Sequence, residues 1–281
     1  MEFYWSVMKV ELLKVQDIND ISAFLDGHNV SRHPIIMGVL SGQQIGFAFI
    51  DNQTDPQMLV VYAVHEMIYL IGDIEEERFE EWFQAELLPI ARSHREEDIN
   101  IETYPQKIES EMKSIFQVIP IKQGTRVAFT FSEEAYISSY KKNTIPEDYT
   151  VAIIDRGILQ KDKNNILTEE ILKFWHSTDS FLESGLGVAA FYKESIIGAC
   201  LSVYQHNGIK EIGINNYNTS HRGKGIASAM ANLFIEECLK RGETPSWTTE
   251  LFRKDSIAIA RKLGFINERI YPSYYFLLEE A

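Results

Sequence analysis

The chain has 281 residues, of which 45% are hydrophobic and 24% are charged. This balance is typical of folded globular domains and excludes a disordered, collagen-like or coiled-coil protein. The formal net charge of -14 disfavours nucleic acid or an anionic membrane surface as a partner and favours a cationic or amine-bearing one. At roughly 100 to 200 residues per domain, the length predicts two domains or one large one.

The two cysteines, Cys200 and Cys238, are too few for a disulfide framework. We therefore expect a cytoplasmic protein in which both thiols act as small buried hydrophobes. The seven histidines show no metal-binding spacing, so no metal site is expected. Residues 1–13 carry charges within their apolar stretch, which predicts neither a signal peptide nor a membrane anchor.

The first half of the chain alternates predicted strands and helices. An apolar stretch with a turn at Gly42 and a glycine at Gly46 comes first, and an amphipathic helix follows it later in the chain. Two further strands flank a second helix. The predicted ranges are 39–50 for the stretch with the turn, 79–94 and 108–116 for the helices, and 99–104 and 127–131 for the strands. The polar stretch 132–146, which ends in a proline, is the predicted domain boundary.

The second half has a similar order of predicted elements. A hairpin, a strand, a glycine-rich loop, a long helix, a strand, a short helix and one or two final strands follow one another. The long helix ends at Lys240, Arg241 and Gly242, and the short helix is predicted to be capped by Asp255. The ranges are 188–192 and 196–204 for the hairpin, 210–214, 226–241, 245–250, 255–263 and 265–278. An offset near 150 residues relates the halves, which indicates either a duplicated α/β unit or a chance resemblance.

The glycine-rich loop lies between a predicted strand and the long helix. Its glycines allow close approach of a ligand, and the helix N-terminus presents unpaired N–H groups and partial positive charge. Arg222 and Lys224 add two cations to this place in an acidic chain. The pattern therefore favours a pyrophosphate site, and the alternative is a glycine-rich turn with solvated cations.

This loop resembles motif A of the GNAT superfamily of acyltransferases, R/Q-x-x-G-x-G/A, through Arg222, Gly225 and Ala227. The resemblance extends to the strand 211–214 and to residues 256–265. The whole chain is similar to a two-part bacterial GNAT family that includes zwittermicin A resistance acetyltransferases. The matching segments are Phe174-Trp175, 211–214, 222–227, 245–247, Asp51-Asn52, Gly72-Asp73 and 145–147.

The resemblance implies a binding site for acetyl-CoA, which would be the cosubstrate. The pyrophosphate would lie on the amides of the loop, and the pantetheine arm would pair with the backbone of a strand splayed from the strand 245–250. The cofactor-binding residues implied in this way are Ile212, Gly213, Ile214, Arg222, Gly223, Lys224, Gly225, Ile226, Ala227 and Ser256.

Glu211 is the first candidate for the general base. Strand residues alternate faces, so Glu211 and Gly213 share one side, while Ile212 and Ile214 pack on the other. On this side Gly213 would leave room for the thioester, and Glu211 would take the proton that an amine loses. The alternative is an edge-strand glutamate that faces solvent. Glu250 is the second candidate for this catalytic role.

The sequence departs from the common family pattern at Ala260, where many relatives carry a tyrosine that protonates the leaving thiolate. Either the thiolate leaves without that acid or another group serves as the acid. Arg253 either meets the CoA phosphate or faces water, and the segment from Trp175 through Phe181 to 185–187 either walls the acceptor site or belongs to the core. The candidates for the acid are Tyr217, His221, Glu250, Tyr274 and Tyr275.

The resemblance and the predicted elements imply an α/β fold with two parts. Residues 146–281 are expected to form the catalytic GNAT domain, and residues 1–145 a degenerate GNAT-like domain without a CoA site. At the offset between the halves, Asp73, Ile74, Glu75 and Glu76 align in sequence with Arg222 to Gly225, so acids replace the loop cations and would repel a pyrophosphate. That first domain would serve as a scaffold or a protein interface.

The expected reaction is direct acetyl transfer from acetyl-CoA to an amine of a small molecule or natural product. An acyl-enzyme is not expected, because the chain shows no nucleophile paired with a base. The alternative is a non-catalytic acyl-CoA-binding or regulatory module.

Overall fold

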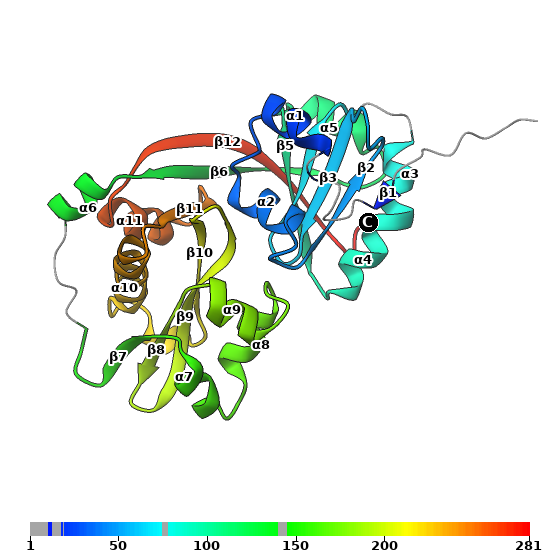
Figure 1. The fold of residues 1–281 in the computed structure, drawn as a ribbon. Coiled ribbons are helices and arrows are strands. Elements are labelled where there is room, and N and C mark those ends of the chain that lie inside the picture. The colour runs from blue at the N-terminus through cyan, green and yellow to red at the C-terminus, as the bar shows by residue number, and fades with distance from the viewer. Residues whose placement is uncertain (1–10, 13–17, 19, 75–77, 140–144) are drawn as a thin grey trace, which may run out of the picture. The chain divides into compact units, whose positions relative to one another are not determined.

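The computed structural model describes residues 11–12, 18, 20–74, 78–139 and 145–281. The chain forms two compact α/β units (Figure 1). Unit 1 consists of Met1–Thr125 and Tyr271–Ala281, and unit 2 consists of Arg126–Ile270. Within the described ranges, no helix is long and apolar enough to cross a membrane.

Unit 1 holds a sheet with the strand order β1-β2-β3-β4-β5-β12. Neighbouring strands are antiparallel except for β4 and β5, which are parallel. The central strands β3 and β4 are buried along their whole length, which accounts for their continuous apolar sequences. The strands are β1 (Glu11–Leu12), β2 (Gly46–Ile50), β3 (Met58–Ala63), β4 (Met67–Gly72), β5 (Asp98–Tyr104) and β12 (Phe265–Leu277).

The helices of unit 1 include the predicted amphipathic segment 79–94, which is divided into three parts. Pro89 lacks an N–H and its ring would clash with the carbonyl of the preceding turn, so a π-helical turn forms just before it. Phe79 and Phe83 on this segment are fully buried in the unit's core. The helices are α1 (Ser22–Gly27), α2 (Pro34–Leu40), α3 (Phe79–Trp82), η2 (Phe83–Leu87), α4 (Leu88–Ser93) and α5 (Glu109–Ile115).

Unit 2 holds a sheet with the strand order β7-β8-β9-β10-β11-β6. Again one neighbouring pair is parallel, here β10 with β11, and the others are antiparallel. The two units therefore share strand order and strand direction, which makes the chain a tandem of one α/β fold. The strands are β7 (Tyr149–Ile153), β8 (Gly187–Tyr192), β9 (Ser195–His206), β10 (Ile209–Asn216), β11 (Thr244–Glu250) and β6 (Lys122–Phe131).

The helices of unit 2 cover its sheet on both faces (Figure 1). The long α10 packs on one face through Met230 and Phe234, and α8 and α9 lie on the other. The apolar stripe of α10 follows the helical period that the sequence predicts. The helices are α6 (Glu133–Ser139), α7 (Arg156–Lys161), α8 (Ile166–Leu172), α9 (Thr178–Ser184), the 3-10 turn η3 (Thr219–His221), α10 (Ile226–Lys240) and α11 (Lys254–Lys262).

The strands β6 and β12 each run from one unit into the other. The last residues of β6 pair with β11 in unit 2, and the last residues of β12 pair with β5 in unit 1. The compact units therefore depart from the linear boundary expected at 145/146, because each sheet takes its sixth strand from the other half of the chain. Within the predicted boundary segment, 133–139 form α6 and 140–144 lie outside the described residues.

One local expectation differs from the structure, and one stretch is more finely divided than expected. Within 39–50, α2 ends at Leu40, a turn follows at Gly42, and Gly46–Ile50 form a strand. Asp255 is not the cap of α11: Arg253 occupies the N-cap without a side-chain hydrogen bond, and Asp255 lies in the first turn. Its negative charge there still favours the N-terminal end of the helix dipole.

The packing of β12, the strand that unit 1 takes from the second half of the chain, can be tested at Phe276. This side chain is fully buried in the core of unit 1, beside the ring of Phe83. We expect Phe276→Ala to lower the free energy of unfolding by about 3 to 5 kcal/mol, because it leaves a cavity. Chemical denaturation measures this loss, and hydrogen exchange locates it in unit 1. Glu279→Ala, an exposed change in the same terminal segment, is the control, and equal stability of both variants would contradict the assignment.

Candidate functional site

The strands β10 and β11 part from each other halfway along their length. They pair in parallel only as far as the match of Glu211 with Ser246, although β10 continues to Asn216 and β11 to Glu250. A register shift against β9 falls between Glu211 and Ile212. Beyond this point, the backbone N–H and C=O groups on one edge of β10 do not pair with β11. The structure therefore has an unpaired backbone edge of β10 where the sequence predicts splayed strands, and we refer to this unpaired stretch as the opening.

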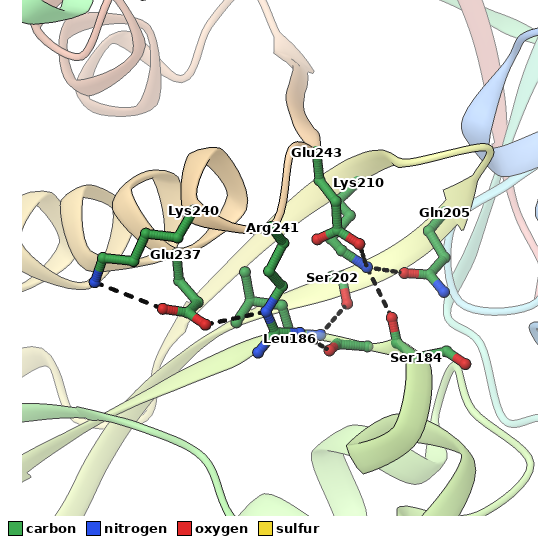
Figure 2. A network of polar contacts seen from close by, with 10 residues as sticks. Ser184, Leu186, Ser202, Gln205, Lys210, Glu237, Lys240, Arg241 and Glu243 are labelled. Carbon is green, nitrogen blue, oxygen red and sulfur yellow. Dashed lines mark hydrogen bonds and ion pairs between the residues drawn. The ribbon is translucent and has the colours of Figure 1, made fainter.

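The opposite end of the same strand pair is held by a buried lysine (Figure 2). The ammonium group of Lys210 donates to the carbonyl of Ser184 at 2.8 Å and to the side chain of Gln205. It also lies 3.2 Å from Oε1 of Glu243, just before β11. Burial lowers the pKa of Lys210, and Glu243 opposes that shift. These contacts tie the start of β10 to its neighbours, so the two strands are closed at this end and open at the other.

The corresponding parallel pair in unit 1 stays closed. The strands β4 and β5 remain paired through the match of Ile71 with Tyr104, one residue before the end of β4. No comparable edge is therefore left for a ligand between these two strands, which the structure describes over their full length.

A glycine-rich loop precedes α10 at the open end of β10. Gly223 and Gly225 have φ angles of +75° and +78°, and a Cβ at either position would meet nothing within 4 Å. Gly225 is the N-cap of α10 and supplies no side chain to its first N–H groups. Arg222 and Lys224 are exposed, whereas the side chain of Ile226 is buried in the core. The loop thus combines free space, helix N–H groups and two cations, which is the composition of an anion site.

An aromatic group supports this loop from the ends of β7 and β8. The hydroxyl of Tyr149 lies 2.9 Å from Nδ1 of His221, and the ring of Tyr192 is 5.0 Å from the His221 ring. The ammonium of Lys224 lies 5.2 Å from the centre of the Tyr149 ring. A side-chain hydrogen bond with Tyr149 raises the pKa of Lys224.

Glu211 is buried at the point where the strands part. Only 3% of it is exposed, and its Oε1 accepts hydrogen bonds from the Thr248 amide at 2.9 Å and from the Thr248 hydroxyl at 2.7 Å. Ile212 and Ile214 pack against the core on the opposite face, as the alternation predicts. The alternative of an edge-strand glutamate facing solvent is wrong, because β10 is a central strand of this sheet.

The expected space at Gly213 is not available on its side-chain face. A Cβ there would collide with a methyl group of Val203 on β9. Gly213 is therefore required by the close packing of the two strands, and the opening lies along the backbone edge of β10 instead.

Glu250 lies at the end of β11, directly opposite Arg126 on β6. Nη1 of Arg126 donates to Oε1 of Glu250 at 2.9 Å, and Nη1 of Arg253 lies 3.6 Å from Oε2. The second guanidinium nitrogen of Arg126 donates to the Thr248 hydroxyl at 3.2 Å. Glu211 and Glu250 therefore belong to one connected group of side chains.

Arg126 and Thr248 are the members of this group that the sequence did not single out. Thr248 lies two positions before Glu250, so strand alternation places both on one face, and this signal was present. Arg126 carried no such signal, because it lies in the first half of the chain and only the pairing of β6 with β11 brings it to the group.

The other candidate residues have separate surroundings. The hydroxyl of Tyr217 is buried with no hydrogen-bond partner among the described residues, and burial raises its pKa. The Tyr274 hydroxyl donates to the carbonyl of Lys107 in unit 1. Ser256 accepts a hydrogen bond from the indole of Trp247 at 3.1 Å, and Ala260 is fully buried in the core of unit 2.

Trp175 and Phe181 belong to the core rather than to a ligand-facing wall. Each is 1% exposed, and their rings lie 5.5 Å apart. The indole of Trp175 donates to the carbonyl of Ser202, and Cβ atoms at Gly185 or Gly187 would collide with Phe181.

The cysteines are both free and buried, as predicted. Burial raises the pKa of Cys238 to about 12 and keeps that of Cys200 well above its usual value. Both are therefore protonated thiols and poor nucleophiles near neutral pH. Among the described residues, no group of three or more His, Cys, Asp or Glu side chains is arranged to hold a metal ion.

The fold and the glycine loop agree with a comparison against known families. The GNAT acetyltransferase family matches residues 25–274, so the chain belongs to that family. This confirms the resemblance to the GNAT superfamily and identifies the tandem α/β units as GNAT folds.

Particular relatives extend over most of the chain. The uncharacterized N-acetyltransferase YdfB of Bacillus subtilis (strain 168) is 26% identical over 233 residues, 82% of this chain and 85% of YdfB. A GCN5-related N-acetyltransferase-like protein from Streptococcus suis 89/1591 has a TM-score of 0.70 at 20% identity, over 93% of this chain and 98% of that one. A tandem GNAT protein from the clavulanic acid biosynthesis pathway has a TM-score of 0.52 at 10% identity, over 96% and 98%.

The hydrogen bonds of Glu211 can be tested at Thr248. We expect Thr248→Val to lower the free energy of unfolding by about 1 to 3 kcal/mol, because it removes the hydroxyl that donates to the buried Glu211 carboxylate and accepts from the Arg126 guanidinium, while the Thr248 amide still donates to Glu211. Chemical denaturation is the measurement. Thr248→Ser keeps the hydroxyl and should lose less, so a valine variant as stable as the serine variant would exclude these bonds as a source of stability.

Proposed function

We propose that this protein transfers an acetyl group directly from acetyl-CoA to an amine of a small molecule or natural product. The observation that carries the proposal is the parting of β10 from β11 beside the glycine-capped start of α10. A bare backbone edge suits an amide-containing arm, and a helix N-terminus with free space around it suits a pyrophosphate. In the described residues of unit 2, these two features lie at the same end of β10.

Acetyl-CoA would be held by the residues that the family resemblance implies. The backbone of Ile212, Gly213 and Ile214 would take the pantetheine arm, and the amides of Arg222, Gly223, Lys224, Gly225, Ile226 and Ala227 the pyrophosphate, with Ser256 nearby. The open space at Gly223 and Gly225 supports this fit. When bound, acetyl-CoA supplies the activated acetyl carbonyl.

Glu211 would act as the general base. Both of its hydrogen bonds within the described residues go to Oε1, so Oε2 is available to take the proton that the attacking amine loses. Glu250 is engaged by Arg126 at 2.9 Å and is the second candidate. The buried cysteine thiols support direct transfer, because neither is suited to carry an acyl group.

Unit 1 would be a scaffold without a CoA site. Its parallel strands stay paired to within one residue of the end of β4, which supports the absence of a slot for the pantetheine arm. The exposed Asp73 adds negative charge after that strand, while Glu75 and Glu76 lie outside the described residues.

The acceptor and the location are inferred from general properties. The net charge of -14 favours a cationic amine, and the similarity to zwittermicin A resistance acetyltransferases suggests an amine-bearing natural product. The two free cysteines favour the cytoplasm.

Release of free CoA across a panel of amines tests the activity. Thiol release with an amine, absent without it, is the expected result. The alternative of a non-catalytic acyl-CoA-binding module is motivated by Ala260, a buried alanine where relatives carry an acid. Stabilisation by acetyl-CoA with no thiol release from any amine would favour that alternative.

The loop can be tested with a matched pair of glycine variants. Gly225 and Gly242 lie at opposite ends of α10, both have positive φ angles, and neither would place a Cβ near another atom. Substitution by alanine should therefore lower the free energy of unfolding by a similar amount at each position, about 1 to 2 kcal/mol. Only Gly225→Ala should lose the stabilisation by acetyl-CoA, which is about 2.7 kcal/mol at 100 times the dissociation constant.

Thermal unfolding and calorimetric titration measure both variants. We expect one acetyl-CoA per chain in the wild type and in Gly242→Ala. Equal loss of binding in both variants would remove the assignment to the loop, and two equivalents per chain would overturn the proposal that unit 1 lacks a site.

The base can be tested by Glu211→Gln. This variant should lower the turnover rate by about 100-fold or more, because general-base catalysis contributes on that order. Acetyl-CoA binding should be nearly unchanged, since the side chain is not among the proposed cofactor contacts. Glu194→Gln, in the exposed turn between β8 and β9, is the control. An unchanged rate and pH profile in Glu211→Gln would transfer the role to Glu250.

A further inference from the structure

A buried cation from the first half of the chain contacts one candidate carboxylate, Glu250, and the threonine that binds the other. Arg126 is 5% exposed and is the residue with which unit 2 begins. Its two terminal nitrogens make separate hydrogen bonds, one to Glu250 at 2.9 Å and one to the Thr248 hydroxyl at 3.2 Å. The guanidinium is planar and permanently charged, so it fixes the two partners relative to each other.

The bond to Thr248 sets the direction of the next hydrogen bond. A guanidinium donates but cannot accept, so the Thr248 hydroxyl must accept from Arg126 and turn its own proton elsewhere. That proton points to Oε1 of Glu211, which is 2.7 Å away. The Thr248 amide donates to the same oxygen at 2.9 Å. Arg126 thereby helps to orient the Thr248 hydroxyl toward Oε1 of Glu211, the oxygen that the Thr248 amide also binds.

The charges of the group lead to the same conclusion. Glu211 is buried and Glu250 is partly buried, and such a pair of carboxylates favours a nearby cation, because an unpaired buried charge is strongly destabilising. Arg126 is the cation that contacts both Glu250 and the partner of Glu211, whereas Arg253 lies 3.6 Å from Glu250 and is half exposed. An arginine that contacts Glu250 and the hydrogen-bond partner of Glu211 orients the two acids together.

We propose that Arg126 is a positioning residue for acetyl transfer, which acts on Glu211 through Thr248. This inference rests on the proposed function, since it takes Glu211 as the base. It assigns a role in the reaction of unit 2 to β6, a strand from the half of the chain that is proposed to hold no CoA site.

A mutant cycle in turnover tests the inference. Arg126→Met replaces the guanidinium group with an uncharged side chain of similar length. Arg126→Lys keeps the positive charge but loses the planar group with two terminal nitrogens. Rates of thiol release are measured with the best amine of the panel, alone and combined with Glu211→Gln. We expect Arg126→Met to lower kcat about 10-fold or more, with a smaller loss for lysine and little change in acetyl-CoA affinity. In the Glu211→Gln background, Arg126→Met should lower kcat almost no further.

The outcomes separate this inference from the proposed function. An equal loss from Arg126→Met in both backgrounds, or a loss confined to KM, overturns the positioning role and leaves Glu211 as the base. An unaffected rate in Glu211→Gln alone overturns the base role first. Arg261→Met, which breaks an exposed ion pair with Glu268 in the same unit, is the control and should keep the wild-type rate.

A second cycle keeps the test decisive if Arg126→Met unfolds or no amine is turned over. Thr248→Val removes only the linking hydroxyl and is combined with Glu211→Gln and with Arg126→Lys. Denaturation midpoints should be non-additive for each pair, because contacting residues couple. Additive shifts in both pairs would show that the link between Arg126, Thr248 and Glu211 is absent, and would overturn the inference.

Discussion

The pairing of β6 with β11 is the constraint on which the rest of unit 2 depends. It covers Trp247 to Glu250 of β11, the residues that do not pair with β10. The pairing with β6 satisfies the backbone groups on one edge of β11 and so holds this part of the strand in the sheet, because unpaired buried N–H and C=O groups are costly. On the other edge, which faces β10, the Thr248 N–H donates to the Glu211 side chain instead of to the β10 backbone. The same pairing brings Arg126 opposite Glu250. It thus places the guanidinium within hydrogen-bond distance of Thr248, the residue that binds Glu211 where the two strands part.

The two units show how one topology can carry a site or lack one. Both sheets have the same strand order and a single parallel pair, and both take their sixth strand from the other half of the chain. In unit 2 the parallel pair opens above the buried contacts of Lys210, and a regular helix of 15 residues begins at the glycine loop. In unit 1 the pair stays closed, and Pro89 interrupts the following helix with a π turn. The difference between the units therefore lies in strand separation and helix regularity, and not in strand order.

Charge is distributed in a way that suits an acidic protein with a local anion site. The chain has an excess of 14 acidic side chains over basic ones, yet Arg222 and Lys224 lie together at the start of α10. Lys224 contacts Tyr149, which also contacts His221. In the same unit the buried Lys210 forms an ion pair with Glu243, whereas Arg222 and Lys224 are exposed at the surface.

The sequence by itself determined the features that depend on neighbouring residues. The period of the apolar side chains predicted α10, the glycines predicted the loop before it, and strand alternation placed Ile212 and Ile214 in the core opposite Glu211. The tertiary structure decided what depends on distant parts of the chain. The exchange of β6 and β12, the approach of Arg126 to Glu250, and the collision that requires Gly213 beside Val203 all arise from pairing between strands that are far apart in sequence or offset by a bulge. Local periodicity records which face of an element is buried, but it holds no information on which strand fills the last position of a sheet, because the same alternation satisfies either partner.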